Sequence, residues 1–454
     1  MYSNFRKTPL ALLSLAAIML AGSLPQAGAT TSAASPNANR ISAGQIAEIR
    51  TIPLAASAPV SAYKRVDPYK IVAIGDSLTV GYEMGITEPS ALYGYVGRIY
   101  EQALYHGAAE VQNFGVLGLK SGGLKNWLDA AVQGTTVAAE DAQSGLSKYP
   151  YAAETIAKSA ALKEAAGEAD LIVMTIGGND FLPIFTELQS RTVEPAELQK
   201  LLDDLLAGYS TTLEASLRAI VSLNPDAKIV LADQYLPLPK PSQFVKVVTE
   251  EQYAVLEKAV SSLHDALETV ESKFAGEGVS LSIVDIATPF AGQQFVLTSI
   301  RDKDVHPNNA GYEVIGQQFA SAIWGEYRKA APLAADVPLH LIVNGKELAG
   351  GNKPVIKNNT TFLPMRDVAN ALGATLAWDG KTQTATIQAA GKKVAFTIGA
   401  KTMNVNGQQV PLTTPAYLAK NGKNLSTYLP LAALSEGIGY QVVYRKTIKT
   451  AFIN

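Results

Sequence analysis

The chain has 454 residues, of which 47% are hydrophobic and 17% are charged, and its formal net charge is -2. This composition excludes a disordered chain, and the length predicts about two or three domains. The sequence has no basic stripe of the kind that binds nucleic acid, and the absence of cysteine excludes disulfides, thiolate metal sites and a cysteine nucleophile.

Residues 1–29 have the three parts of a secretory signal peptide. Arg6-Lys7 is the positive region, residues 9–24 are apolar, and Ala27-Gly28-Ala29 is a small-x-small cleavage site. We expect cleavage after Ala29 and a secreted protein, free or associated with the cell envelope. The apolar run is short for the ~20 residues of a membrane span, so we expect no transmembrane anchor after cleavage. Residues 30–67, rich in Ala, Ser, Pro and Thr, are predicted to form a flexible linker.

Short apolar strands alternate with helical stretches between residues 68 and 330. The predicted strands span residues 71–74, 111–114, 171–176, 228–232 and 281–285. The predicted helices span residues 92–105, 152–166, 196–223, 249–274 and 310–328. This alternation predicts an α/β fold with a five-stranded parallel sheet in the flavodoxin-like order 2-1-3-4-5, covered by helices on both faces. The long segments 82–91, 133–150 and 182–195 are expected to form the rim of a cleft.

The first predicted strand runs directly into Gly75-Asp76-Ser77-Leu78. Gly75 allows the backbone to turn sharply, so that Ser77 lies at the carboxyl end of the strand, where ligands bind in open α/β sheets. A serine hydroxyl becomes a good nucleophile when a base removes its proton and a third group holds that base. We therefore predict that Ser77 is a nucleophile whose partners lie at the same edge of the sheet.

His306 is the histidine best placed to act as this base. It lies beyond the fifth predicted strand in Asp304-Val305-His306-Pro307, where Pro307 keeps it out of helical geometry just before a predicted helix. Asp304 or Asp302 could accept a hydrogen bond from its ring. The chain has four histidines, and the others are predicted to be surface or capping residues: His106, His264 and His340.

Two further turns at this edge could supply hydrogen-bond donors. Asn113-Phe114-Gly115-Val116-Leu117-Gly118 follows the second predicted strand, and Gly177-Gly178-Asn179-Asp180 follows the third. Acyl transfer needs N–H donors aimed at the oxygen that becomes negative, and backbone amides or an asparagine amide serve this purpose. Taken singly, each stretch is also typical of an ordinary βα turn.

These four stretches have the order and spacing of the four blocks of the SGNH (GDSL) hydrolase family, which residues 68–330 resemble. The resemblance implies a flavodoxin-like sandwich and a serine esterase or lipase that needs no metal or cofactor. It implies that Ser77 is the nucleophile and His306 the general base. It also implies an oxyanion hole formed by the N–H groups of Ser77 and Gly118 and by the side chain of Asn179.

The chain departs from the family pattern at the acid of the catalytic triad. The family acid usually stands three residues before the histidine, and Lys303 occupies that position here. We choose Asp304, two residues before His306, as the acid and keep Asp302 as the alternative.

Residues 337–454 have a different sequence pattern, which predicts short strands and frequent turns. Val343-Asn344-Gly345-Lys346 returns as Val405-Asn406-Gly407-Gln408, and Thr361-Phe362-Leu363-Pro364 returns as Thr427-Tyr428-Leu429-Pro430. Each unit of this imperfect repeat is predicted to contain a hairpin around Asn-Gly, a short helix and a strand. The result is a small α+β module that follows an Ala- and Pro-rich boundary near residues 330–338.

This module resembles the copper amine oxidase-like N-terminal domain of secreted bacterial proteins, through stretches such as residues 362–368 and 372–374. Apart from His340 it has no histidine, and the chain has no cysteine, so it lacks the ligands that copper prefers. We expect a module that contacts the cell wall or a polysaccharide. The alternative is a folded stalk without a ligand.

The leading hypothesis is a secreted serine esterase or lipase-like hydrolase that acts on a lipid or an acylated glycan through an acyl-enzyme on Ser77. One alternative is a carbohydrate O-deacetylase at the cell wall or on plant glycan, which needs a short polar pocket where a lipase needs a deep apolar one. The alternative from another class is a catalytically inactive cell-envelope binding protein, supported by Lys303. The sequence does not decide the shape of the pocket, because the rim segments mix apolar and polar residues.

Overall fold

The computed structural model describes residues 67–454, apart from residues 87, 89–90, 246, 349–352, 390 and 422–423. The predicted signal peptide, residues 1–29, lies outside the described residues, as does the predicted linker, residues 30–67, except for its last residue. None of the helices in the described part of the chain combines the length and the apolar character that a membrane-spanning helix requires.

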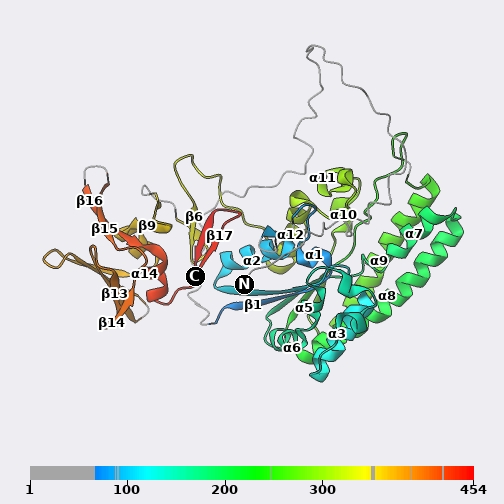
Figure 1. Ribbon diagram of the computed structural model, residues 1–454, viewed down its shortest axis with the longest axis horizontal. Coiled ribbons are helices and arrows are strands. Elements are labelled where there is room, and N and C mark those ends of the chain that lie inside the picture. Colours follow the sequence, from blue (N-terminus) through cyan, green and yellow to red (C-terminus); the bar gives the residue numbers. More distant parts are fainter. Residues whose placement is uncertain are drawn as a thin grey trace, which may run out of the picture.

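A five-stranded parallel sheet forms the centre of the first part of the chain (Figure 1). Its strands are β1 (Tyr69–Gly75), β2 (Ala109–Gly115), β3 (Leu171–Thr175), β4 (Lys228–Ala232) and β5 (Leu281–Val284). Their order in the sheet is β2-β1-β3-β4-β5, and every neighbouring pair is parallel. The predicted α/β fold class and strand order are therefore confirmed.

The side chains of β1 alternate between two apolar cores, one on each face of the sheet. The long helices of the two covering layers are α2 (Tyr95–His106), α3 (Ser121–Gln133), α6 (Ser159–Gly167), α8 (Pro195–Leu223), α9 (Glu250–Gly276) and α12 (Asn309–Trp324). Ile71 and Ala73 pack in the core shared with α2 and α12, whereas Val72 and Ile74 pack in the core shared with α3, α6, α8 and α9. Because successive strand residues face opposite sides, a strand that is apolar at every position is buried on both faces.

Three of these helices differ from the sequence-based prediction, and the first is α12, which ends at Trp324 and not at residue 328 because Gly325 takes a left-handed conformation with φ 74°. The predicted helix 152–166 is divided into α5 (Ala152–Ile156) and α6, because Lys158 leaves helical geometry with φ −85° and ψ 32°. The sequence did not predict α3, since its start contains two glycines, which have a low helix propensity. Tertiary packing compensates for this, because Trp127 and Leu128 of α3 are both 0% exposed.

Short helices connect the main elements at the edges of the sheet. They are α1 (Ser77–Val80), α4 (Ala139–Ala142), η3 (Leu146–Lys148), α7 (Leu182–Ser190), α10 (Ala287–Phe290), α11 (Gln294–Leu297) and η4 (Ile300–Asp302). Several of them lie in the long segments that were expected to surround a cleft.

The N-terminal parts of α8 and α9 extend past the sheet and form a smaller core with α7. α8 has 29 residues, about 43 Å at 1.5 Å per residue, whereas the five-residue strand β4 is about 17 Å long. The C-terminal part of α8 packs against the sheet, but its N-terminal part belongs to a separate cluster, which we call the cap cluster. Its buried members are Ile184, Val193, Leu198, Leu202, Leu238, Val248, Tyr253 and Leu256.

The C-terminal module is built from short strands and two helices. Its elements are β6 (His340–Val343), β7 (Lys346–Glu347), β8 (Val355–Lys357), β9 (Thr360–Pro364), α13 (Met365–Ala371), β10 (Thr375–Asp379), β11 (Thr384–Ala389), β12 (Lys392–Thr397), β13 (Thr402–Val405), β14 (Gln408–Pro411), β15 (Tyr417–Asn421), β16 (Asn424–Pro430), α14 (Leu431–Gly437), β17 (Val442–Arg445) and β18 (Thr450–Ile453). The strands form sheets in the orders β10-β11-β12-β13-β14, β15-β16-β9-β8 and β17-β18-β6-β7.

The internal repeat is visible in this module as two similar series, β9-α13-β10 and β16-α14-β17. The β6–β7 and β13–β14 hairpins turn at the two Asn-Gly pairs, as predicted. Asn344 and Asn406 have φ values of 47° and 51°, a left-handed conformation that asparagine tolerates better than most residues.

The module packs against α2 and the edge strand β2 of the α/β domain. Ile342 and Phe452, both 0% exposed, belong to the apolar core that covers one face of the parallel sheet. The Gln441 side chain bonds to both the N–H and the carbonyl of Ala109, and Arg445 forms an ion pair with Glu101 at 3.0 Å. Figure 1 shows β6 and β17 beside α2, between the α/β domain and the rest of the C-terminal module.

Candidate active site

Ser77 lies at the tight turn between β1 and α1. Gly75 ends β1 with φ 152°, and a Cβ at this position would lie 2.1 Å from the Thr175 carbonyl oxygen, so only glycine fits. The buried side chain of Asp76 accepts a hydrogen bond from the Leu78 N–H and thereby caps α1. This turn fixes Ser77 as the first residue of α1, at the carboxyl edge of the sheet.

Ser77, His306 and Asp304 form one chain of hydrogen bonds. His306 Nε2 lies 2.8 Å from Ser77 Oγ, and His306 Nδ1 lies 2.5 Å from Asp304 Oδ1. The same Asp304 oxygen also accepts a hydrogen bond from the His306 backbone N–H at 2.9 Å. The structure therefore brings these three predicted residues together, with the imidazole between the hydroxyl and the carboxylate.

The loop before His306 explains why Asp304 and not Asp302 contacts the imidazole. Lys303 has φ 65°, a left-handed turn that ends η4, and the Asp304 N–H then bonds back to the Ser299 carbonyl. Asp302 is exposed in η4, whereas Asp304 is only 3% exposed. Although burial of Asp304 favours its neutral form, the hydrogen bonds and charge of His306 lower the pKa of Asp304 below its ordinary value.

The predicted oxyanion donors face the same cavity as Ser77. Gly118 and Asn179 line this cavity together with Ser77 and His306. The Asn179 amide donates one hydrogen bond to the Leu119 carbonyl, which leaves its second N–H for another acceptor. Gly118 has φ 74°, and a Cβ there would lie 2.3 Å from the Tyr149 ring, so the loop requires glycine at this position.

The cavity extends from Ser77 into the cap cluster. Its volume is about 350 Å³, and most of its lining residues are apolar, with about half of the lining supplied by apolar side chains of α7, α8 and α9 and of the loop after β4. Representative residues are Ile184, Phe185, Leu202, Leu256, Val260 and Leu263. No residue of the C-terminal module lines this cavity in the described part of the chain.

Sequence reasoning missed Tyr82 as a neighbour of the imidazole. The Tyr82 and His306 rings meet edge to face with centroids 4.6 Å apart, and the Tyr312 hydroxyl bonds to the Tyr82 carbonyl. Tyr82 lies in the expected rim segment 82–91, but nothing in its spacing pointed to His306. Tyr82 and His306 are far apart in the sequence, and only the tertiary fold brings the loop around residue 306 beside the segment that follows α1.

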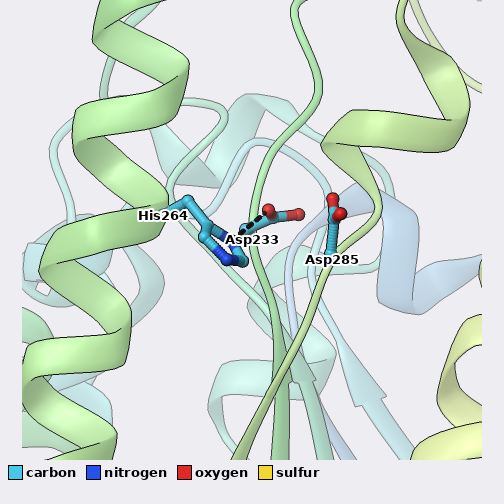
Figure 2. Close-up of side chains that lie close together, drawn as sticks. All are labelled: Asp233, His264 and Asp285. Carbon is cyan, nitrogen blue, oxygen red and sulfur yellow. Dashed lines mark hydrogen bonds and ion pairs between the residues drawn. The ribbon is translucent and has the colours of Figure 1, made fainter.

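Asp233, His264 and Asp285 form a second cluster of titratable groups at the same edge of the sheet (Figure 2). His264 Nδ1 lies 2.9 Å from Asp233 Oδ2, and the other Asp233 oxygen accepts hydrogen bonds from the backbone N–H groups of Ile286 and Ala287. These contacts join α9, the end of β4 and the start of α10. We interpret the cluster as a structural clamp, because both Asp233 oxygens already have protein partners. His264 is thus more than the surface residue that the sequence predicted.

Asp76 should make stability depend on pH. Burial raises the pKa of Asp76 from 3.8 to about 7, although the Leu78 N–H and the Thr175 hydroxyl bond to its carboxylate. Between these pH values the folded chain keeps a proton on Asp76 that the unfolded chain has released. The contribution of Asp76 to the free energy of unfolding therefore falls as pH rises from about 4 to about 7.

Asp76→Asn should remove this dependence, because asparagine cannot ionise but keeps an oxygen for the Leu78 N–H. We expect the free energy of unfolding of the variant, relative to that of the wild type, to rise between pH 4 and pH 7 and then stay constant. Urea unfolding of both proteins at several pH values measures this difference. Parallel curves would contradict the burial argument.

Two family models match the chain. One, described as the GDSL-like lipase/acylhydrolase family, matches residues 73–314, and the other, described as the copper amine oxidase N-terminal domain, matches residues 342–453. Among curated proteins, the uncharacterized protein YpmR of Bacillus subtilis strain 168 is 24% identical over 262 residues, which cover 56% of this chain and 80% of that protein.

Solved structures of esterases and lipases are also similar to the chain. A lipase from a goat rumen metagenome is 20% identical, with 57% of this chain and 99% of that chain covered and a TM-score of 0.38. An extracellular lipase of Streptomyces rimosus is 18% identical, with 55% and 99% covered and a TM-score of 0.36. A variant of an acetyl xylan esterase from Geobacillus stearothermophilus is 18% identical, with 58% and 97% covered and a TM-score of 0.32.

Proposed function

The chain belongs to the GDSL-like lipase/acylhydrolase family and is a carboxylic ester hydrolase, and we propose that it works through an acyl-enzyme on Ser77. The observation that carries this proposal is the hydrogen-bonded chain from Ser77 Oγ through His306 to Asp304. A serine beside a histidine that a buried carboxylate orients is the arrangement that nucleophilic acyl transfer requires.

In this mechanism His306 Nε2 takes the hydroxyl proton while Ser77 Oγ attacks the ester carbonyl. The ionised Asp304 stabilises the resulting imidazolium, and the N–H groups of Ser77, Gly118 and Asn179 donate to the oxyanion. His306 then gives its proton to the leaving alcohol, and the acyl group remains on Ser77. Water, deprotonated by His306, releases the carboxylic acid and restores the hydroxyl.

We further propose that the preferred substrate carries a medium- or long-chain acyl group, as lipids do. The cavity beside Ser77 has a volume of about 350 Å³ and apolar walls, so an acetyl group would fill a small part of it. This observation favours an esterase or lipase over the carbohydrate O-deacetylase. The inactive binding protein was suggested by Lys303, which stands at the usual position of the family acid. The contact between Asp304 and His306 favours catalysis instead, because it supplies a carboxylate for the imidazole.

The test is hydrolysis of p-nitrophenyl esters from acetate to palmitate. Each methylene buried in this cavity stabilises the bound transition state by about 0.8 kcal/mol. The value of kcat/KM should therefore rise by up to about fourfold per methylene until the cavity is filled. Val260 lines the cavity, so Val260→Phe should narrow it. This variant should lower kcat/KM for long esters but not for the acetate ester. An optimum at acetate in the wild type would instead support the deacetylase.

We also propose that the protein is exported and that the C-terminal module holds it near the cell envelope or a polysaccharide. The signal-peptide pattern of residues 1–29 supports export, and a mature N-terminus at Thr30 would be its direct sign. The module does not fit a copper site, because its single histidine, His340, bonds to Glu347 and the chain has no cysteine. Binding of the mature protein to isolated cell walls tests the envelope contact.

A further inference from the structure

The loop that carries the Gly118 N–H is held by two side chains, of which Asn179 belongs to the four sequence blocks and Gln143 does not. Within residues 118–120, the Leu119 N–H donates to the Val116 carbonyl, and the Lys120 carbonyl accepts from the Leu124 N–H. The Leu119 carbonyl accepts from the Asn179 amide. The two remaining bonded groups, the Gly118 carbonyl and the Lys120 N–H, both have the side chain of Gln143 as their partner.

Of the three N–H groups of residues 118–120, only that of Gly118 has no acceptor among the described residues. This is also the group that the proposed mechanism aims at the oxyanion. A donor that is fixed in place before the reaction stabilises developing charge better than one that must reorient. Within residues 118–120 the hydrogen bonds therefore hold every N–H and carbonyl group except the N–H that the chemistry needs.

We propose that Gln143 is a positioning residue for the oxyanion hole, an inference that rests on the proposed function of Ser77. Its amide spans the loop like a clamp, since Nε2 donates to the Gly118 carbonyl at 2.9 Å and Oε1 accepts from the Lys120 N–H at 2.8 Å. One planar amide thus fixes the peptide groups on both sides of Leu119. Neither contact involves the substrate, so Gln143 acts through Gly118.

The surroundings of Gln143 hold the clamp itself in place. Gln143 directly follows α4, and the Asn126 side chain of α3 bonds to the carbonyl of the preceding Ala142. Gly123 leaves room for the amide, because a Cβ there would lie 2.6 Å from Gln143 Oε1. The Tyr149 ring packs against Gly118, where a Cβ would lie 2.3 Å from the ring. The segment that the sequence assigned to the rim therefore also supports the oxyanion loop.

The substitution that tests the clamp is Gln143→Met, which keeps a similar volume but cannot form either hydrogen bond. A misplacement of about 1 Å can cost a factor of about 100 in rate, and loss of one oxyanion donor costs about 100- to 1,000-fold. We expect kcat for p-nitrophenyl butyrate to fall about 10- to 100-fold with KM changed by less than about threefold. Affinity for an alkyl boronic acid, which mimics the tetrahedral oxyanion, should fall by the same factor as kcat/KM.

Glu140→Ala is the matched control on the same segment. Glu140 bonds to the Gly145 N–H and the Ser147 hydroxyl and has no hydrogen bond to residues 118–121 in the described part of the chain. Glu140→Ala should therefore loosen the segment 133–150, but it should leave kcat and the affinity for the boronic acid within about threefold of the wild-type values. Equal losses in both variants would show that segment folding, and not the clamp, sets the rate.

Gln143→Glu gives a second variant should the methionine variant fail to fold. It keeps an acceptor for the Lys120 N–H but places a carboxylate oxygen against the Gly118 carbonyl, so it should also lower kcat and boronic acid affinity. The clamp proposal is overturned if a folded Gln143 variant keeps wild-type kcat while Ser77→Ala is inactive. If Ser77→Ala itself keeps full activity, the proposed function fails, which is a different result.

Discussion

Ser77→Ala should lower kcat/KM for a p-nitrophenyl ester by about 10⁴-fold or more. The substitution removes the oxygen that forms the acyl-enzyme, and among the described residues no other hydroxyl is hydrogen-bonded to the His306 ring. Loss of the serine in serine hydrolases typically costs about 10⁶-fold in kcat, with a residual rate supplied by the oxyanion hole and by binding. Initial rates of the wild type and the variant, measured on the same ester, test this expectation.

Ser222→Ala is the matched control, because Ser222 is exposed near the C-terminal end of α8 and its hydroxyl bonds, among the described residues, only to the Ala219 carbonyl of its own helix. It should retain wild-type activity. A p-nitrophenyl phosphonate should add one phosphonyl group to the wild type and none to Ser77→Ala, as intact mass would show. Phosphonylation of the alanine variant, or its undiminished ester hydrolysis, would place the nucleophile elsewhere.

Asp304→Asn is expected to have the second-largest effect, a fall in kcat of about 10³- to 10⁴-fold. Asparagine is neutral, so it cannot stabilise the imidazolium, and its N–H₂ group can hold His306 in the wrong tautomer. The 2.5 Å contact between His306 Nδ1 and Asp304 Oδ1 makes the rate sensitive to this change. The measurement is kcat for a short-chain ester at saturating concentration.

Asp302→Asn, which removes the same charge two residues earlier, should leave kcat within about twofold. Asp302 is exposed, and its side chain has no bond to His306 in the described structure. The pair of variants therefore distinguishes the acid by position alone. A large loss with Asp302→Asn and none with Asp304→Asn would mean that the loop around Lys303 is arranged differently during catalysis.

Sequence reasoning was most successful where one local rule dominated. The central strands β1, β3 and β4 are buried on both faces, which a run such as Ile71–Ile74 indicates without any tertiary information. It failed for α3, whose glycine-rich start opposes a helix until Trp127 and Leu128 are packed. It also could not decide between Asp302 and Asp304 as the acid. That choice depends on the left-handed conformation of Lys303, and lysine is not a residue type that favours this conformation.

The sequence alone predicted the α/β fold, the strand order and the position of Ser77 and His306 at the carboxyl edge of the sheet. These follow from periodicity, from glycine at tight turns and from the four ordered blocks, all of which are local in the chain. Tertiary structure alone decided the volume and the apolar lining of the cavity beside Ser77, the contacts of Gln143 with residues 118–120, and the absence of described module residues from the cavity lining. Each of these depends on side chains from distant segments, whose contacts are set by the packing of whole helices and not by any pattern within one segment.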